Sequence, residues 1–351
     1  MANKKLRFLC FGMGAIGTYI GGSLAAYGYE VSFLEKPDSN PSLIHQELKV
    51  ETPNGMKTST RHKVFFSLDE ALKDGKYDIA LLAVKSFDTL AVIDSIRPFA
   101  DEFPVVLCLQ NGVENETLLE SVLGSGKVIG ASIATAVGKR GSGDVFVQKM
   151  RGMGVESNHP LSANLIESLN NAGLKARGYP IREDLKWSKM LTNLLGNATS
   201  AILNWTPAQI FSDRGIYQIE VAQIRETLLV MKKRGIHLVN LPGTPIKPLI
   251  WAMTNLPLII SQPISLLALG KGRGNKMPSF HIDLYNGQKQ SEVTFLNGAV
   301  VRAAESLGLT APVSKGLTKI LENLACGSIQ KSDFANQPGN LISSIEIEIK
   351  R

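Results

Sequence analysis

The sequence contains few cysteines and few histidines. Its three cysteines, Cys10, Cys108 and Cys326, are far apart and odd in number, so they fit neither a disulfide framework nor a zinc-ligand spacing. The five histidines are scattered, and none has a carboxylate or a cysteine at ligand spacing. These shortages predict a protein of the reducing cytoplasm that binds no metal ion.

Dense clusters of one charge are also missing. The chain has 38 lysines and arginines against 31 aspartates and glutamates, which gives a net charge of +7 over 351 residues. No basic run is interleaved with aromatic residues, as a nucleic-acid groove would require. The mild positive excess suits a small anionic ligand, so we predict such a substrate and no nucleic acid.

Long hydrophobic runs without helix breakers do not occur. The most apolar stretch, residues 248–270, is long enough to span a bilayer, but it contains Pro248, Pro257 and Pro263. Prolines at this density would break the helix that a lipid-exposed span needs. We therefore expect a buried connection, a lid over a cleft or a protein interface ahead of membrane contact. Peripheral anchoring on a membrane stays open as an alternative.

The first half of the chain alternates apolar segments with segments of helical periodicity. Expected strands cover residues 6–11, 31–35, 77–84, 105–110 and 127–134, and expected helices cover 15–27, 89–96 and 114–123. Near-continuous apolar strands between helices are typical of a parallel sheet buried on both faces. The sequence therefore predicts an α/β domain with a doubly wound sheet over residues 1–180, with antiparallel strands within 138–154.

The second half reads as helices. Apolar residues recur at three- and four-residue spacing over residues 182–203, 217–234, 291–307 and 314–326. The tail, 343–351, alternates isoleucine and charge, which predicts a short strand or a frayed end. We expect a mainly helical second domain over residues 181–351.

A glycine-rich turn follows the first expected strand. Gly12-Met13-Gly14-Ala15-Ile16-Gly17 reads G-x-G-x-x-G and opens the first expected helix. Gly12 permits a tight turn, Gly14 lets a pyrophosphate approach the backbone, and Gly17 allows close helix–strand packing. The motif alone is weak and also fits an ordinary βα turn. Its place between strand and helix predicts a Rossmann-type domain that binds a nicotinamide dinucleotide.

The end of the second expected strand bears on the choice of coenzyme. Glu35 lies eighteen residues after Gly17, where an acid binds the adenosine ribose diol and disfavours a 2′-phosphate. Lys36 follows it and would instead pair with that phosphate. The two residues argue for opposite coenzymes, or they are both solvated charges.

A second group of polar residues lies in the first expected helix of the second half. Lys189, Asn193 and Asn197 are spaced i, i+4 and i+8, which places them on one face of a continuous helix. A solvated polar stripe would show the same spacing. One cation beside two amides, however, suits an oxyanion and a carbonyl, so we predict a substrate site with Lys189 as its catalytic residue.

These motifs together resemble the ketopantoate reductase (2-dehydropantoate 2-reductase) family over nearly the whole chain. The glycine motif is followed by Val84-Lys85-Ser86-Phe87-Asp88-Thr89 and by Gln110-Asn111-Gly112. Lys189, Asn193 and Asn197 match the family's catalytic lysine and its two substrate asparagines, and Pro278-Ser279 and Ser291-Glu292 match two later elements. The family pattern has a small residue and an arginine where this chain has Glu35 and Lys36.

The resemblance implies the remaining site residues. Asn111, Asn193, Asn197 and Ser279 would contact the substrate, while Lys189 would protonate the carbonyl oxygen during hydride transfer. The coenzyme would contact residues 12–17 (Gly12, Met13, Gly14, Ala15, Ile16 and Gly17) together with Glu35, Lys36, Lys85, Asn111, Ala136 and Glu292. NADPH is the coenzyme that the family implies, and Glu35 keeps NADH open.

The implied activity is reduction of 2-dehydropantoate to (R)-pantoate in pantothenate biosynthesis. Two alternatives remain: a reductase of another 2-oxoacid, and a nicotinamide-binding regulatory protein without turnover. The first draws support from the apolar stretch 241–274, which is longer than the resemblance leads one to expect. The sequence leaves a homodimer open and does not decide it.

Overall fold

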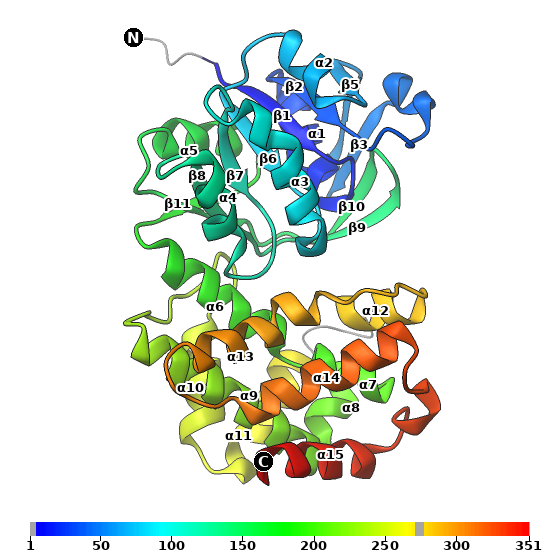
Figure 1. Ribbon diagram of the computed structural model, residues 1–351, viewed down its shortest axis with the longest axis vertical. Helices are drawn as coiled ribbons and strands as arrows, with labels where there is room; N and C mark the ends of the chain where they lie inside the picture. Colours follow the sequence, from blue (N-terminus) through cyan, green and yellow to red (C-terminus); the bar gives the residue numbers. More distant parts are fainter. Residues whose placement is uncertain (1–4, 271–276, 351) are drawn as a thin grey trace. The chain divides into compact units, whose positions relative to one another are not determined.

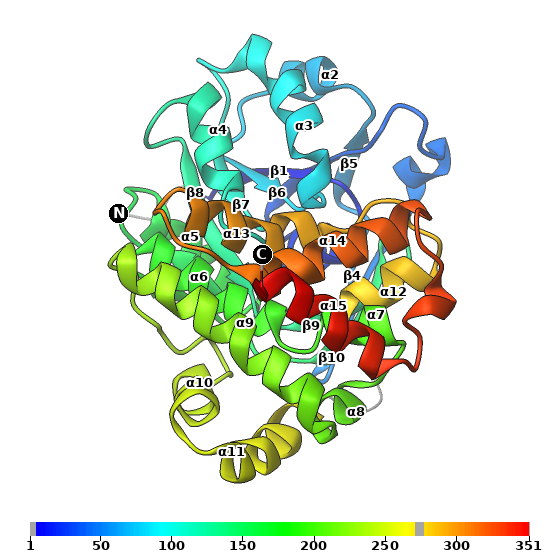
Figure 2. The ribbon, with the colours of Figure 1, turned by 60° about the horizontal axis from the view of Figure 1, so that its bottom comes forward.

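The structure, a computed structural model, describes residues 5–270 and 277–350 (Figures 1 and 2). The chain divides into two compact units. The N-terminal unit comprises Met1–Lys186 with Leu241–Thr244, and the helical unit comprises Trp187–Asn240 with Pro245–Arg351. Each unit is described below by itself.

An eight-stranded sheet forms the centre of the N-terminal unit. Its order is β12-β11-β8-β7-β6-β1-β2-β5. In chain order these strands are β1 (Arg7–Phe11), β2 (Glu30–Leu34), β5 (His62–Phe65), β6 (Ile79–Leu82), β7 (Val105–Cys108), β8 (Val128–Ile133), β11 (Met153–Glu156) and β12 (Ala176–Tyr179). The pairs from β5 to β8 are parallel, and β11 runs antiparallel to β8. Because β1 pairs with both β2 and β6, the strand order reverses beside it, which confirms the predicted doubly wound sheet.

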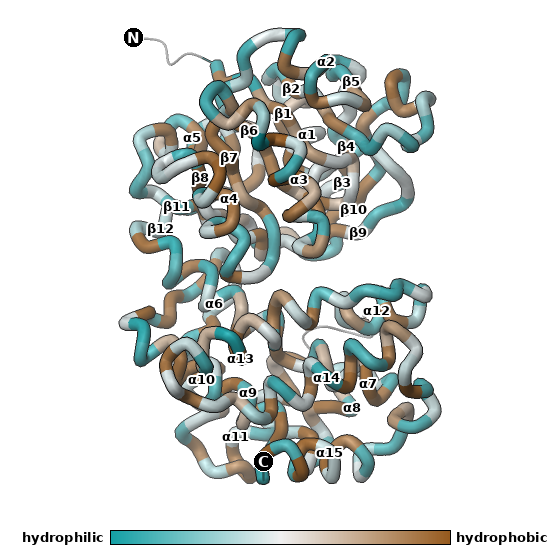
Figure 3. The backbone as a smooth tube through the Cα atoms, in the orientation of Figure 1, coloured by the Kyte–Doolittle hydropathy of each residue, from teal (hydrophilic) through white to brown (hydrophobic). Residues whose placement is uncertain are grey.

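Both faces of this sheet are buried, which explains its apolar strands. Phe8 and Cys10 of β1 pack into one hydrophobic core, and Leu9 and Phe11 pack into a second core. Alternate residues of a strand point to opposite faces, so a strand covered on both sides must be apolar throughout. Figure 3 shows this as brown colour along β6 and β7.

Helices and a second sheet complete the N-terminal unit. Its helices are α1 (Ala15–Tyr27), α2 (Leu68–Lys73), α3 (Thr89–Ile96), α4 (Asn115–Leu123) and α5 (Ser162–Asn171), with short turns η1 (Pro41–His45), η2 (Ser86–Asp88) and η3 (Arg97–Phe99). The second sheet has the order β4 (Gly55–Ser59), β3 (Leu48–Thr52), β10 (Asp144–Lys149) and β9 (Ala136–Gly141). The antiparallel pair of β9 and β10 confirms the antiparallel strands expected within 138–154.

The second unit is built from helices. They are α6 (Arg182–Leu194), within which the division between units falls, α7 (Ala198–Leu203), α8 (Pro207–Ser212), α9 (Arg214–Lys233), α10 (Ile246–Asn255), α11 (Leu258–Ser265), α12 (Ser279–Tyr285), α13 (Asn297–Glu305), α14 (Pro312–Cys326) and α15 (Pro338–Lys350). A π-helical turn, η4 (Leu266–Gly270), follows α11, and η6 (Glu292–Phe295) and η7 (Lys331–Asp333) are 3-10 turns. The mainly helical second part is therefore confirmed.

Two predicted helices are divided in the structure. The helix expected over residues 182–203 ends at Leu194, and Gly196 adopts a φ of +64° before α7 begins. A left-handed residue stops helix propagation, and glycine adopts that conformation without strain. The helix expected over 291–307 likewise divides into η6 and α13.

The tail prediction is wrong. Residues 343–350 continue the helix α15 instead of forming a strand or a frayed end, and residue 351 lies outside the described residues. Leu341, Ile345 and Glu348 are buried at helical spacing, and Glu348 accepts a hydrogen bond from Lys319 of α14 at 2.9 Å. The alternation of isoleucine and charge was therefore part of a 3.6-residue repeat.

Candidate functional site

The glycine turn has the geometry that a pyrophosphate needs. Gly12 has a φ of +89° between β1 and α1, and Gly14 caps the start of α1. A Cβ on Gly17 would lie 2.0 Å from the Gly12 carbonyl oxygen, so no side chain fits there, whereas a Cβ on Gly14 would meet no atom within 4 Å. The helix therefore packs tightly against the strand while Gly14 is open to an approaching group, which is the arrangement that binds anions at a helix N-terminus.

Glu35 lies directly at this turn. Its carboxylate accepts a hydrogen bond from the Met13 backbone N–H, and Ser39 Oγ donates to its other oxygen at 3.3 Å. Lys36 is 70% exposed and pairs with Asp88 at 3.6 Å. The acid of the Glu35–Lys36 pair is thus held at the glycine turn, and the base is engaged by another carboxylate.

A cavity of ≈ 480 Å³ adjoins Glu35. Leu43 of η1 and Arg140 of β9 also line it. The Arg140 guanidinium pairs with Glu51 and, at 3.4 Å, with Asp144. The arginine that lines this cavity therefore already has acidic partners.

The turns after β6 and β7 share one hydrogen-bond network. Ser86 Oγ donates to the Asn111 carbonyl oxygen at 2.9 Å, and Asn115 Nδ2 donates to the same oxygen at 2.8 Å. Gln110 Nε2 donates to the Lys85 carbonyl at 3.3 Å. Because β6 and β7 are parallel neighbours, their carboxyl ends meet at one edge. The structure therefore brings together Lys85 and Asn111, which the sequence had placed at separate motifs.

A buried ion pair behind this edge was not predicted. Lys186 Nζ lies 2.7 Å from Glu116 Oε1, with side chains only 4% and 3% exposed. The ammonium also donates to the Gln110 carbonyl at 2.7 Å, next to Asn111. Burial alone would lower the pKa of Lys186, but attraction to Glu116 reverses this and raises it. The pair therefore keeps its charge in the interior and fixes the Gln110–Asn111 backbone.

Ala136 and Cys108 also belong to strands of the N-terminal unit. Ala136 is half-buried at the first position of β9, opposite Lys149 of β10, and its predicted contact with the coenzyme stays a prediction. Cys108 is buried at the end of β7, where burial raises the pKa of its thiol. A thiol kept protonated is a poor nucleophile, so Cys108 serves as a small apolar side chain.

In the helical unit, Lys189 and Asn193 lie on one face of α6. They are four residues apart and half-buried, and Thr192 Oγ donates to the Lys189 carbonyl at 2.7 Å. Asn197 does not extend this helical stripe, because α6 ends at Leu194 and Asn197 precedes α7. The expectation of three residues on one continuous helix is therefore wrong for Asn197.

Asn197 instead holds the start of α12. Its Oδ1 accepts from the Phe280 N–H at 3.0 Å, and its Nδ2 donates to Ser279 Oγ at 3.3 Å. Asn197 is 5% exposed. The structure thus brings two predicted substrate residues, Asn197 and Ser279, into direct contact across more than eighty residues of chain.

The turn between α6 and α7 depends on a buried acid that the sequence analysis missed. Glu220 is fully buried and accepts from the Gly196 N–H at 2.8 Å and from Thr199 Oγ at 2.6 Å. Gln223 donates to the same carboxylate at 2.8 Å and accepts from Asn297 Nδ2 at 3.1 Å. The spacing of Glu220 and Gln223 on α9 resembles that of any amphipathic helix, so the sequence held no signal for this network.

Glu292, predicted to contact the coenzyme, is 7% exposed at the start of η6. Ser291 Oγ caps this turn by accepting from the Val293 N–H at 3.2 Å.

Among residues 5–270 and 277–350, the structure shows no cluster of three histidines, cysteines or acids that is able to hold a metal ion. Within the same residues, none of the helices combines the length and apolarity that crossing a membrane requires.

Comparisons with known proteins show which family the chain resembles in sequence. The sequence model described as "Ketopantoate reductase PanE/ApbA" matches residues 8–157, and "Ketopantoate reductase PanE/ApbA C terminal" matches residues 182–325. The 2-dehydropantoate 2-reductase of Pyrococcus horikoshii is 25% identical over 334 residues, covering 92% of this chain and 100% of that protein.

Solved structures share the fold. A PanE/ApbA family ketopantoate reductase from Ralstonia eutropha has a TM-score of 0.75 at 24% identity, covering 91% of this chain and 98% of that one. A D-mandelate dehydrogenase solved with NADH and anilino(oxo)acetate has a TM-score of 0.73 at 18% identity, covering 92% and 100%. With sequence models that match both halves of its length, the chain belongs to the ketopantoate reductase family.

Proposed function

We propose that the protein is a nicotinamide-dependent reductase that converts 2-dehydropantoate to (R)-pantoate, a step of pantothenate biosynthesis. Family membership supports an NAD(P)-dependent oxidoreductase. The observation that carries the proposal is the group in the helical unit, where Lys189 and Asn193 share one face of α6 and Asn197 bonds to Ser279. These are the residues that the family resemblance assigns to catalysis and substrate binding.

The N-terminal unit fits a dinucleotide. The open position at Gly14 and the N-terminus of α1 suit a pyrophosphate, and Glu35, which accepts from the Met13 N–H, would bind the adenosine ribose. The resemblance favours NADPH, but a 2′-phosphate beside Glu35 would meet a like charge, while Lys36 and Arg140 are engaged by other carboxylates. We therefore propose NADH as the preferred coenzyme.

The proposed chemistry assigns tasks to Lys189, Asn193 and Ser279. A reduced nicotinamide held at residues 12–17 would supply a hydride to the 2-keto carbon, and the electron pair of the C=O π bond would then move to the oxygen. Lys189 Nζ stabilises the developing oxyanion and gives it a proton, which yields the 2-hydroxyacid. Asn193 and Ser279 orient the hydroxyl and carboxylate of the substrate, which lowers the entropic cost of reaching the reactive geometry.

The first experiment follows loss of dihydronicotinamide absorbance with NADH and NADPH in separate reactions. The substrates are 2-dehydropantoate and a panel of other 2-oxoacids that includes benzoylformate. The proposal is supported if 2-dehydropantoate is turned over with a higher kcat/KM than any other 2-oxoacid of the panel. A higher kcat/KM for another 2-oxoacid would make that acid the proposed substrate in place of 2-dehydropantoate. Coenzyme binding without turnover of any 2-oxoacid would refute the proposal that the protein is a reductase.

The Lys189→Met variant tests the catalytic assignment. We expect kcat to fall about 10²–10⁴-fold, the usual contribution of a positioned proton donor, while the Kd for the coenzyme stays unchanged. Lys233→Met, which removes an exposed lysine of α9, is the matched control and should keep the wild-type kcat. Wild-type turnover by Lys189→Met would remove Lys189 from the mechanism.

A further inference from the structure

Helix α11 turns its polar residues inward and its apolar residues outward. Ser261 and Ser265 are fully buried, and Ser265 Oγ lies 3.1 Å from the hydroxyl of buried Tyr217. Ile259 is 84% exposed, and Leu267 in the following turn is 67% exposed. A helix on the surface of a water-soluble unit normally has the opposite arrangement. The outward face of α11 therefore suits an apolar environment better than it suits water.

The exposed apolar side chains form one surface. Ile259 and Leu267 are eight residues apart and Ile260 and Ile264 four apart, so all four project from the same side of α11 and its continuation. Helix α10, which packs beside α11 (Figure 2), adds Trp251 at 59% exposure. We call these five residues the α10–α11 face. Exposed apolar patches of this kind mark interaction sites.

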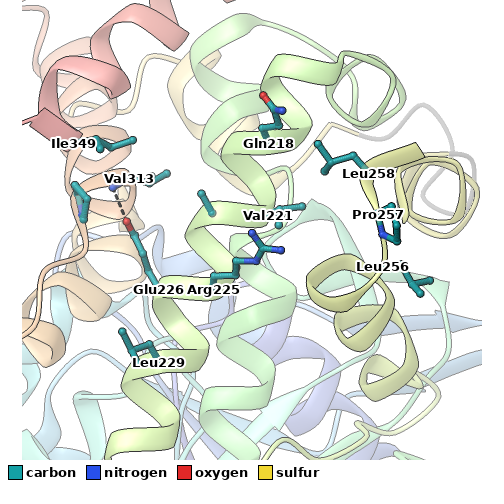
Figure 4. A pocket seen from close by; sticks show the side chains of 12 residues that line it. Gln218, Val221, Arg225, Glu226, Leu229, Leu256, Pro257, Leu258, Val313 and Ile349 are labelled. Carbon is teal, nitrogen blue, oxygen red and sulfur yellow. Dashed lines mark hydrogen bonds between the residues drawn. The ribbon is translucent and has the colours of Figure 1, made fainter. Parts of the chain in front are cut away.

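The apolar surface continues into a groove on the same unit. The turn Leu256–Leu258 joins α10 to α11 and also lines a groove of ≈ 620 Å³, opposite Val221 and Val313 (Figure 4). The groove contains one acid, Glu226, whose carboxylate accepts from the Val313 N–H at 2.7 Å and from Ser314 Oγ at 2.7 Å. That carboxylate is therefore committed to the start of α14, and burial raises its pKa.

Charge decides what covers this surface. Residues 227–270 contain four basic residues and no aspartate or glutamate, so the segment carries only positive charge. Lys247 lies one helical turn before Trp251, and Arg225 Nη2 donates to the Thr254 carbonyl at the end of α10 at 3.0 Å. Two copies meeting through this face would bring like charges together. A partner with an anionic surface and an apolar interior would instead pair with the cations and bury the isoleucines at the same time.

We propose that the helical unit docks on the surface of an anionic phospholipid bilayer through the α10–α11 face. Trp251 and the isoleucines enter the boundary between headgroups and acyl chains, and Lys247 and Arg225 lie against the phosphates. The protein lies on the bilayer, since α10 and α11 span only Ile246–Asn255 and Leu258–Ser265. This proposal takes up the peripheral contact that the sequence left open, and it does not depend on the reductase activity.

Vesicle flotation of the full-length protein tests the proposal. The probes are vesicles of phosphatidylcholine alone and vesicles of phosphatidylcholine mixed with phosphatidylglycerol. We expect flotation with the anionic vesicles and a bound fraction at least about tenfold lower in the Ile259→Ser/Leu267→Ser variant, which loses two large apolar contacts. Leu90→Ser, which replaces a 63% exposed leucine of the N-terminal unit, is the matched control and should float like wild type.

Two more measurements separate the proposal from its rivals. Lys247→Gln should weaken binding to the anionic vesicles, whereas Lys289→Gln, at another exposed lysine of the helical unit, should not. Far-UV circular dichroism of each variant checks that it is folded. Absence of wild-type flotation, or equal flotation of the double variant, overturns the proposal. If the wild-type protein does not float but sediments as a dimer, and Ile259→Ser/Leu267→Ser sediments as a monomer, the α10–α11 face binds a second copy of the chain. That result also overturns the membrane proposal.

Discussion

Replacing Lys186 with methionine would leave the Glu116 carboxylate buried without its counter-charge. The two side chains are 4% and 3% exposed, and their charged atoms lie 2.7 Å apart. Removing one partner of a buried ion pair costs about 3–5 kcal/mol, because the remaining charge keeps its desolvation penalty. The Gln110 carbonyl also loses its hydrogen bond from Lys186, so the cost falls on the turn that carries Asn111.

Urea unfolding measures this cost. The urea dependence of the unfolding free energy is about 1–3 kcal/mol per molar, so a loss of about 3–5 kcal/mol in Lys186→Met should lower the midpoint of the N-terminal unit by about 1–5 M. All three tryptophans, Trp187, Trp205 and Trp251, belong to the helical unit, so their fluorescence reports that unit while far-UV circular dichroism reports both. The dichroism transition should therefore move to lower urea ahead of the fluorescence transition.

Two more variants make the reasoning refutable. Within the described part of the chain, Lys127 Nζ donates to no side chain and to two backbone carbonyls, those of Phe103 at 2.9 Å and Asp101 at 3.3 Å. Lys127→Met should therefore cost about 1 kcal/mol. Lys186→Met/Glu116→Leu removes both charges and should recover most of the loss, since buried pairs replaced by apolar residues are often neutral. A wild-type midpoint for Lys186→Met, or a double variant that shows the sum of both single losses, would contradict the account.

Three other predictions follow from the N-terminal unit. Gly17→Ala should lower the thermal midpoint of this unit, because the new Cβ would lie 2.0 Å from the Gly12 carbonyl oxygen. Gly14→Ala should fold normally and weaken coenzyme binding, measured by titration. Equal thermal midpoints for the two variants would contradict the turn geometry. Glu35→Ala should raise the ratio of kcat/KM with NADPH to kcat/KM with NADH by about tenfold, the equivalent of about 1.4 kcal/mol, and an unchanged ratio would mean that Glu35 does not contact the ribose. Burial lowers the pKa of His62 below the unfolded value, so its stabilising contribution is present above about pH 6.5 and is lost as pH falls through the folded pKa. The wild-type thermal midpoint should therefore drop more between neutral and acidic pH than that of His62→Gln, and parallel pH profiles would count against this.

The sequence predicted the parts of the fold that local pattern determines. The bounds of α1 and α3 match the expected 15–27 and 89–96, because a glycine turn and apolar periodicity mark them. Strands β3 and β4 were missed, because each has only five residues and β4 is mostly exposed. They pair with each other as a short hairpin, and the second partner of β3, β10, lies far along the chain. The break at Gly196 was missed because a single glycine inside an otherwise helical pattern does not reveal its φ.

The candidate site shows the same limit. Motifs predicted Lys189 and Ser279 as site residues, because their neighbours in sequence carry the family pattern. Lys186, Glu116 and Glu220 carry no motif, and their importance arises from burial beside partners that are distant in the chain. A buried charge is visible only once the surrounding core is known, since the same residue on an exposed face would be ordinary.

The position of Asn197 refines the proposed substrate site. Its Oδ1 is engaged by the Phe280 N–H and its Nδ2 by Ser279 Oγ, so its first task in this fold is to fix the start of α12. An amide that donates to Ser279 Oγ orients this hydroxyl and leaves its proton available to a substrate carboxylate. We infer that Ser279 and Asn193 make the direct substrate contacts and that Asn197 acts through Ser279. The i+8 spacing from Lys189 then reflects the turn at Gly196, which carries Asn197 from α6 toward α12.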